Sequence, residues 1–323
     1  MADHNPCSTL TLKGVSSYRK DVLMKTIKAF LKSHPLLSYF ALTFAITWSL
    51  FVFAVGGPGG IPATKEEFTT LPLLAILAVL VGPSVSGILF TGLLYGREGF
   101  RDLLTRMRRW RVGTRWYAVA LLTAPLAFTV VLIPLWLISP VFLPGIFASE
   151  AKVSFVLMSI MVGLIVGIFE ELGWTGFAVP TLLKLRYGVL STGLIVGVLW
   201  GAWHLLGNDI WASVATSGGL PPALFAVLVG LVLLVGQLPA YRVLMVWVYD
   251  RTGSLLLAML MHASYSASTF ILGPVAGPGA MSGLYLLAYV VASAAVTWVI
   301  VATLAVATRG NLSRQPPPRR QVA

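Results

Sequence analysis

Two adjacent glutamates, Glu170 and Glu171, close an apolar run that begins near Val153. A carboxylate at membrane depth is costly to bury, so such a residue usually marks a functional site. Helical spacing places Gly167 and Gly163 on the same face as the acid pair. Small residues on that face let another helix approach closely, so we expect the pair to face protein rather than lipid. Two carboxylates that repel each other suit a general base.

Two of the four histidines, His204 and His262, also lie inside apolar runs. His204 stands in the segment L-W-G-A-W-H-L-L, and Ser266 follows His262 by one helical turn. An imidazole and a hydroxyl at this spacing could donate hydrogen bonds to one developing oxyanion. A single histidine on an apolar face is often an ordinary core residue. Two histidines on separate helices, together with the glutamate pair, indicate a catalytic constellation.

The composition predicts a membrane protein. Of the 323 residues 57% are hydrophobic and only 11% are charged, and several apolar runs reach the roughly 20 residues that a helix needs to cross a bilayer. We therefore predict an all-α fold with one polytopic membrane domain. The net charge of +12 does not indicate nucleic acid, because the basic residues lie in short segments between apolar runs. Cys7 is the only cysteine, which excludes an intrachain disulfide.

The chain divides into three parts by composition. Residues 1–34 are basic and read either as an amphipathic segment on an anionic membrane surface or as an unstructured tail. Residues 35–307 form the transmembrane domain, and residues 308–323 form a basic, proline-rich tail. About eight spans are expected, at 35–54, 71–95, 116–138, 153–172, 189–206, from 223, from 254, and 284–307. The basic clusters fall on one side of this arrangement, so both termini are predicted to be cytoplasmic.

One inconsistency remains in this topology. Lys184 and Arg186 place residues 173–187 in a cytoplasmic connector, with the two glutamates near the inner end of their span. His204, however, lies roughly 22 Å into the next span at the helical rise. Either that span begins deeper, or the connector dips into the membrane. Gly193, Gly197 and Gly201 of this span also predict a helix–helix seam, whether or not anything is catalysed.

Three segments in the second half of the chain resemble a known family. They are E-E-L-G-W-T-G-F, W-G-A-W-H and H-A-S-Y-S, in that order. They are similar to the three motifs of the CPBP family, which comprises type II CAAX prenyl endopeptidases and bacterial Abi-type membrane proteins. The resemblance covers about residues 153–269 and implies an intramembrane endopeptidase of the cell membrane, with its site toward the cytoplasm.

The resemblance also implies roles for individual residues. Glu170 and His204 would activate water, Glu171 would support the site, and His262 and Ser266 would stabilise the oxyanion. Two positions depart from the pattern. Thr175 stands where the family often has an arginine, which removes a cation beside the glutamates, and Ser266 stands where the eukaryotic prenyl proteases have an asparagine. These departures argue against prenyl-protein processing.

Metal dependence is open at this stage. Direct activation of water by a glutamate needs no metal or other cofactor, and it is the mechanism that we favour. The alternative is a zinc ion held by Glu170, His204 and His262, with a fourth position open for water. The H-E-x-x-H segment of many zinc proteases is absent from the sequence.

The expected partners are the lipid bilayer and a membrane-associated protein or peptide substrate, and no nucleic acid. The oligomeric state is open. Two other functions compete with the protease. A proton-coupled transporter could use the same residues as a relay, although we find no inverted repeat in the sequence. A non-catalytic immunity or scaffold protein could retain a degenerate site.

Overall fold

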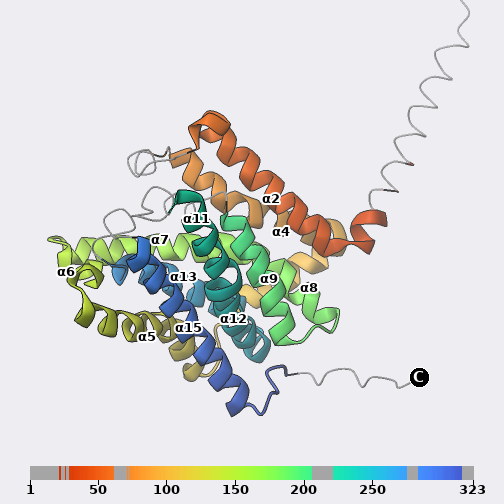
Figure 1. The fold of residues 1–323 in the computed structure, drawn as a ribbon. Coiled ribbons are helices and arrows are strands. Elements are labelled where there is room, and N and C mark those ends of the chain that lie inside the picture. Colours follow the sequence, from red (N-terminus) through yellow and green to blue (C-terminus); the bar gives the residue numbers. More distant parts are fainter. Residues whose placement is uncertain are drawn as a thin grey trace, which may run out of the picture.

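The computed structural model describes residues 22, 26, 29–61, 71, 73–205, 221–274 and 283–314. These residues are almost entirely helical, and among them only one isolated bridge, between Pro144 and Pro274, has β geometry. The predicted all-α fold is therefore confirmed (Figure 1). Most of the predicted N-terminal segment 1–34 and the tail after residue 314 lie outside the described residues.

The helices follow the predicted apolar runs closely. The main helices are α2 (Pro35–Ala54), α4 (Leu73–Met107), α5 (Thr114–Ile138), α7 (Lys152–Gly173), α8 (Val179–Lys184), α9 (Val189–His204), α11 (Pro222–Leu231), α12 (Leu238–Thr252), α13 (Leu255–Ile271) and α15 (Gly283–Ala307). Among the described residues, six helical stretches are long and apolar enough to cross a membrane, and α9 and α13 are shorter apolar helices. The count of eight crossings and the side on which the termini lie stay predictions.

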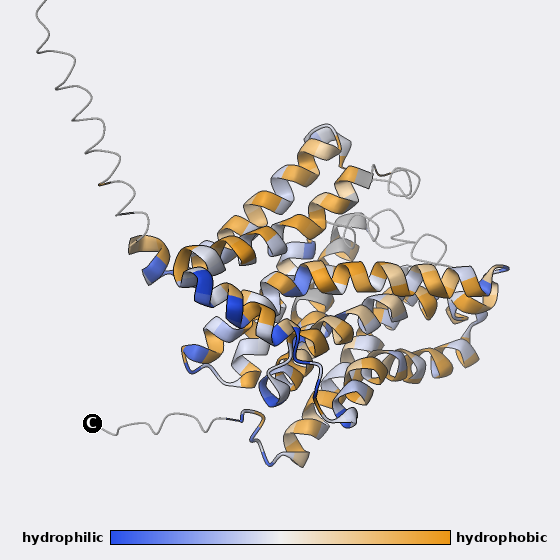
Figure 2. Cartoon of the chain, turned by 180° about the vertical axis from the view of Figure 1, so that it is seen from behind, coloured by the Kyte–Doolittle hydropathy of each residue, from blue (hydrophilic) through white to orange (hydrophobic). Residues whose placement is uncertain are grey.

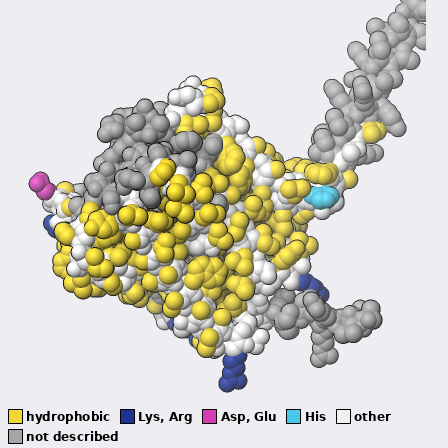
Figure 3. All heavy atoms as spheres, in the orientation of Figure 1, with side chains coloured by type: hydrophobic (Ala, Val, Ile, Leu, Met, Phe, Trp, Pro, Cys, Tyr) yellow, Lys and Arg dark blue, Asp and Glu magenta, His cyan; other side chains and the backbone are white. Residues whose placement is uncertain are grey.

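The outside of the molecule is largely apolar. Hydrophobic residues run along most of the length of the helices in Figure 2, and apolar side chains cover the face seen in Figure 3. Large apolar side chains face outward far from either end of their helices, including Leu126 at 60% exposure and Val299 at 63%. Such a surface is stable against lipid hydrocarbon and unstable against water.

Glycines set the closest helix contacts, as predicted. A Cβ atom on Gly163 would lie 2.5 Å from the carbonyl oxygen of Ala263, and one on Gly167 would lie 2.5 Å from that of Met259. These contacts join α7 to α13 backbone against backbone. Gly197 makes the same kind of contact between α9 and α12. The seams bring the helices that carry the glutamates and His262 together.

The prediction of a connector directly after residue 172 is wrong. The helix does not end at residue 172, because α7 continues through the π-helix η3 (Trp174–Ala178) into α8, and 152–184 forms one continuous apolar stretch. Glu170 therefore lies 14 residues before Lys184, or roughly 21 Å at the helical rise. This depth matches that of His204 in α9 and removes the inconsistency in the predicted topology.

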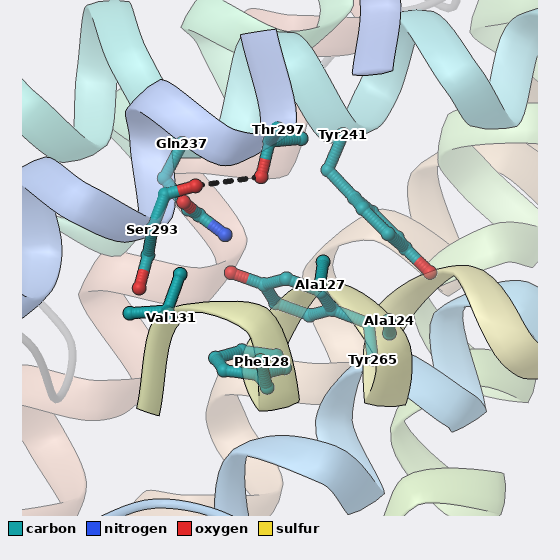
Figure 4. A pocket seen from close by; sticks show the side chains of 9 residues that line it. All are labelled: Ala124, Ala127, Phe128, Val131, Gln237, Tyr241, Tyr265, Ser293 and Thr297. Carbon is teal, nitrogen blue, oxygen red and sulfur yellow. Dashed lines mark hydrogen bonds between the residues drawn. The ribbon is translucent and has the colours of Figure 1, made fainter. Parts of the chain in front are cut away.

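A small cavity of about 10 Å³ lies between α5, α12, α13 and α15 (Figure 4). The side chains of Gln237, Tyr265 and Ser293 lie close together around it. Tyr241, also on its wall, packs its ring 4.4 Å from that of Tyr265 and donates a hydrogen bond of 2.8 Å to the carbonyl of Met261. No predicted site residue lines this cavity, so it is separate from the acid pair.

Candidate active site

The two glutamates lie in the last turn of α7, immediately before the π-helix η3. Glu170 is 3% exposed and Glu171 is fully buried. Two adjacent carboxylates can be buried at this depth only if other groups supply hydrogen bonds and positive charge. The contacts of the two side chains show that they are satisfied in different ways.

Glu171 is surrounded by donors on both oxygens. Nη1 of Arg242 lies 2.8 Å from its Oε1 and 2.9 Å from its Oε2. His262 donates through Nδ1 to Oε1 at 2.8 Å, and the hydroxyl of Thr175 donates to Oε2. An ionised carboxylate with a cation and two further donating side chains is held in one orientation. Glu171 is therefore the structural member of the pair.

Glu170 makes a different set of contacts. Its Oε2 accepts hydrogen bonds from the indole nitrogens of Trp174, at 3.2 Å, and Trp200, at 2.8 Å. Nε2 of His262 lies 3.9 Å from the same oxygen, which is too far for a hydrogen bond. Among the described residues no hydrogen bond reaches Oε1 of Glu170. This oxygen is the one in the pair with capacity for a further ligand.

His204 is the last residue of α9 and is half-buried. Its Nδ1 lies 2.9 Å from the carbonyl oxygen of Trp200, and its ring packs 4.7 Å from that of Trp203. Because a carbonyl oxygen can only accept, the hydrogen of a neutral His204 lies on Nδ1 and its Nε2 is a free acceptor. His204 is joined to the glutamates through Trp200, which bonds Glu170, and not by direct contact.

Helix α2 supports the end of α9. The indole of Trp203 donates to the hydroxyl of Thr47 at 2.9 Å, and the indole of Trp48 donates to the carbonyl of Trp203 at 3.2 Å. Phe40 of the same helix stacks on Trp174, the residue after α7. The first half of the chain, which carries no recognisable motif, thus holds aromatic residues of the site in place.

Ser266 is the predicted site residue with the fewest contacts. Its carbonyl oxygen accepts a hydrogen bond from Thr269, while no hydrogen bond of its hydroxyl appears within the described part of the chain. The structure thus brings Glu170, Glu171 and His262 together directly and links His204 through Trp200. Ser266 follows His262 by one turn of α13, without a contact to the glutamates.

Sequence reasoning missed Arg242, although a signal for it existed. Arg242 is fully buried in α12, and its guanidinium lies over the ring of Trp200, 4.2 Å from the centroid. A lone arginine inside an apolar span is itself a mark of function. The cation that seemed lost with Thr175 is present after all, supplied from a different helix. Thr175 adds a hydroxyl where an arginine is not needed.

The wide turn after the glutamates is held by the C-terminal segment of α4. This helix is broken at Gly96, whose φ of 57° favours glycine, before it continues to Arg106. The guanidinium of Arg106 donates to the carbonyls of Thr175, at 3.4 Å, and Gly176, at 3.0 Å. A π-helix leaves carbonyls without their usual partners, and π turns occur often at functional sites. Arg106 supplies the missing donors.

A cavity of about 200 Å³ adjoins this turn. Charged residues of α4 and α8 line it together with Phe177 and Gly176 of η3: Glu98, Asp102, Arg106 and Lys184. The cavity lies beside the π turn that follows the glutamates. Its charged lining indicates contact with water or lipid headgroups rather than with hydrocarbon.

The zinc alternative does not fit the arrangement of the side chains. It requires Glu170, His204 and His262 to converge on one point. Within the described ranges no three histidine, cysteine, aspartate or glutamate side chains form a group that could hold a metal ion. The side chains around Glu170 are therefore considered as a site that activates water without a metal.

Comparison with known proteins gives a match to a family model and a match to a curated protein. The model of a family described as type II CAAX prenyl endopeptidase Rce1-like matches residues 152–268. A CAAX prenyl protease 2 of Methanococcus maripaludis is 24% identical over 177 residues, which make up 51% of this chain and 60% of that protein. The matched family segment contains the five predicted site residues and Arg242. Both comparisons confirm the resemblance to CAAX proteases seen in the sequence.

Proposed function

We propose that this protein is an intramembrane endopeptidase that hydrolyses a peptide bond of a membrane-associated protein or peptide. The observation that carries the proposal is the unequal use of the two glutamates. Glu171 is saturated by Arg242, His262 and Thr175, whereas every hydrogen bond described for Glu170 goes to one oxygen. A carboxylate with one restrained and one available oxygen suits a general base.

The reaction uses the residues as follows. Oε1 of Glu170 takes a proton from a water molecule, and Nε2 of His204 accepts the second hydrogen of that water and orients it. The water oxygen attacks the carbonyl carbon of the substrate, and the electrons of the C=O double bond move to oxygen. When this tetrahedral intermediate collapses, the C–N bond breaks and the amine nitrogen takes the proton from Glu170. Glu170 is then ready for another cycle.

Trp174 and Trp200 have a defined part in this reaction. Their indole N–H groups hold Oε2 of Glu170 in place, so the carboxylate cannot rotate when the proton arrives on Oε1. Restricting the base to one geometry contributes to the rate because it removes motion that the transition state cannot tolerate. The segments E-E-L-G-W-T-G-F and W-G-A-W-H thus contain the two indoles that orient Glu170.

The cell membrane and access from the cytoplasm are part of the proposal. The charged lining of the 200 Å³ cavity beside η3 and the basic segment of α4 support a cytoplasmic position for this end of the protein. The CAAX prenyl protease that this chain resembles suggests substrates that carry a lipid near the cleaved bond. Because Thr175 and Ser266 depart from the pattern of prenyl proteases, we propose unprenylated membrane-associated peptides first.

The test is cleavage of quenched fluorescent peptides by the purified protein in liposomes. The peptides are offered as matched farnesylated and unmodified pairs, so that the substrate class is decided in the same experiment. We expect cleavage by the wild type and a loss of at least about 10³-fold in Glu170→Gln, which keeps both indole hydrogen bonds. Equal cleavage by the wild type and this variant would show that the activity belongs to a contaminant.

A chelator in a parallel reaction decides the metal question. If Glu170 activates water directly, cleavage continues at the same rate after metal removal. A loss of activity that zinc restores would contradict the metal-free mechanism, although the endopeptidase itself would stand. Absence of cleavage with every peptide, at a protein concentration that gives stable folded samples, would count against the protease.

A further inference from the structure

One edge of Arg242 is buried without a partner. Its Nη1 serves both oxygens of Glu171, but Nε and Nη2 have no hydrogen-bond partner among the described residues, and both are fully shielded by protein. Buried polar groups in proteins are nearly always paired, so an unpaired one calls for an explanation. Here the unpaired groups belong to a cation, for which the cost of burial is greatest.

The unpaired edge has a specific shape. Nε and Nη2 of a guanidinium present two N–H bonds that are nearly parallel, and this fork suits oxygen atoms that carry negative charge. Glu171 binds the opposite nitrogen and leaves the fork unused. If the only role of Arg242 were to neutralise Glu171, the fork would face the carboxylate and make the stronger bidentate pair.

The guanidinium of Arg242, the carboxylate of Glu170 and the ring of His262 all contact one indole, that of Trp200. Trp200 carries the guanidinium of Arg242 on its ring face at 4.2 Å and bonds Oε2 of Glu170 through its edge at 2.8 Å. The ring of His262 packs against the same indole, with centroids 5.0 Å apart. Arg242 is thus part of the cluster around the general base, and not a distant structural ion pair.

The residues expected to bind the oxyanion are poorly placed for that role. Nδ1 of His262 donates its hydrogen to Glu171, so a neutral imidazole carries no hydrogen on Nε2. The hydroxyl of Ser266 shows no contact with the cluster in the described part of the chain. An oxyanion formed beside Glu170 still needs donors, and the free fork of Arg242 supplies two.

We propose that Arg242 is a catalytic residue whose free Nε–Nη2 edge binds the substrate carbonyl oxygen and stabilises the oxyanion of the tetrahedral intermediate. This inference rests on the proposed endopeptidase function. Electrons move from the C=O double bond to the oxygen held by Arg242, and they return when the C–N bond breaks. The fixed salt bridge to Glu171 holds the guanidinium, and with it the fork, in one orientation before the reaction.

The first test is Arg242→Lys, with Arg101→Lys as the matched control on an exposed ion pair. Lysine keeps the charge beside Glu171 but has no fork. We expect kcat to fall about 10²-fold with KM nearly unchanged, as for the loss of an oxyanion donor. The affinity for a peptide phosphinate, a stable mimic of the tetrahedral intermediate, should fall in parallel. An unchanged kcat, or equal losses of phosphinate and substrate affinity, would overturn the proposal.

A second variant guards against misfolding. Arg242→Ala leaves a space in which free guanidinium ion can bind, so millimolar guanidinium should restore at least about tenfold of the lost rate, while ammonium should not. Equal rescue by both ions would mean that only charge is required, which contradicts a role for the fork. If Glu170→Gln is inactive and Arg242→Lys is fully active, the endopeptidase stands and this inference fails. If the wild type cleaves nothing, the failure lies with the proposed function instead.

Discussion

The same substitution should destabilise the protein strongly at Glu171 and only slightly at Glu170. Glu171→Gln removes the negative charge that pairs with Arg242. In the wild type, Nη1 of Arg242 lies 2.8 and 2.9 Å from the two carboxylate oxygens of Glu171, and both side chains are fully buried. Breaking such a pair on one side leaves a buried charge unpaired and costs about 3–5 kcal/mol. Glu170 has no cationic partner of this kind, and a glutamine at 170 can still accept from both indoles. We expect Glu170→Gln to change stability by about 1 kcal/mol or less.

The measurement is thermal unfolding of the purified variants in one detergent, followed by the cleavage assay on the same samples. With about 2–4 °C of midpoint shift per kcal/mol for chains of this order of size, Glu171→Gln should unfold roughly 10 °C below Glu170→Gln. Glu98→Gln is the control, because the Glu98–Arg101 pair is exposed and should contribute almost nothing.

Stability and activity should change independently in these two variants. Glu170→Gln should be folded and inactive, and Glu171→Gln should be both destabilised and inactive. If both variants unfold at the same temperature, the ion pair in α12 does not hold Glu171 and the assignment of a structural role to this residue is wrong. If Glu170→Gln unfolds first, the roles of the two residues are reversed.

Three further changes probe the support of the site. Gly167→Leu would place its Cβ 2.5 Å from a backbone carbonyl of α13 and should destabilise the protein by more than about 2 kcal/mol. Gly113→Leu should not, because a Cβ there would come no closer than 3.9 Å to its neighbours. Trp200→Phe keeps the ring but loses the N–H bonded to Glu170, so kcat should fall about tenfold with a stability loss near 1 kcal/mol. Arg106→Gln removes the donors to the π-helix, and amide hydrogen exchange should rise at residues 174–178 before any other part of α7.

The sequence predicted the helices well because apolar runs of this length have few alternatives in a membrane. It also predicted the acid pair and His262 as neighbours, because each is an isolated polar residue among apolar ones and must find partners inside the protein. The glycine positions of α7 predicted the seam that joins them. In a membrane protein, an isolated polar residue in an apolar run must be buried against protein, and such residues can be identified from the sequence alone.

The depth of the glutamates could not be read in the same way. Lys184 and Arg186 predicted a cytoplasmic connector at residues 173–187, and the helix was expected to end at residue 172. The structure continues the helix through a π turn whose carbonyls are satisfied by Arg106, about 70 residues earlier in the chain. A donor so distant in sequence leaves no local signal. Arg242 is different, because a lone arginine inside an apolar span is itself a signal.

The position of the cation offers a final test of how this site is built. Residue 175 is one helical turn after Glu171, where its hydroxyl already reaches the carboxylate, and the related family often places an arginine there. In the double variant Thr175→Arg, Arg242→Gln, the charge moves from α12 to the turn after α7, into space that the shorter glutamine leaves. Since Glu171 regains a cation, we expect the double variant to recover more than half of the stability that Arg242→Gln loses.

Turnover should behave differently in this double variant. The moved guanidinium approaches Glu171 from its own helix and no longer lies on the face of Trp200, so its free edge is not presented beside Glu170. We therefore expect kcat to stay about 10²-fold below the wild type while unfolding returns toward the wild-type temperature. Recovery of both properties together would show that the site requires only a positive charge near Glu171, and that the direction of the Arg242 fork has no catalytic importance.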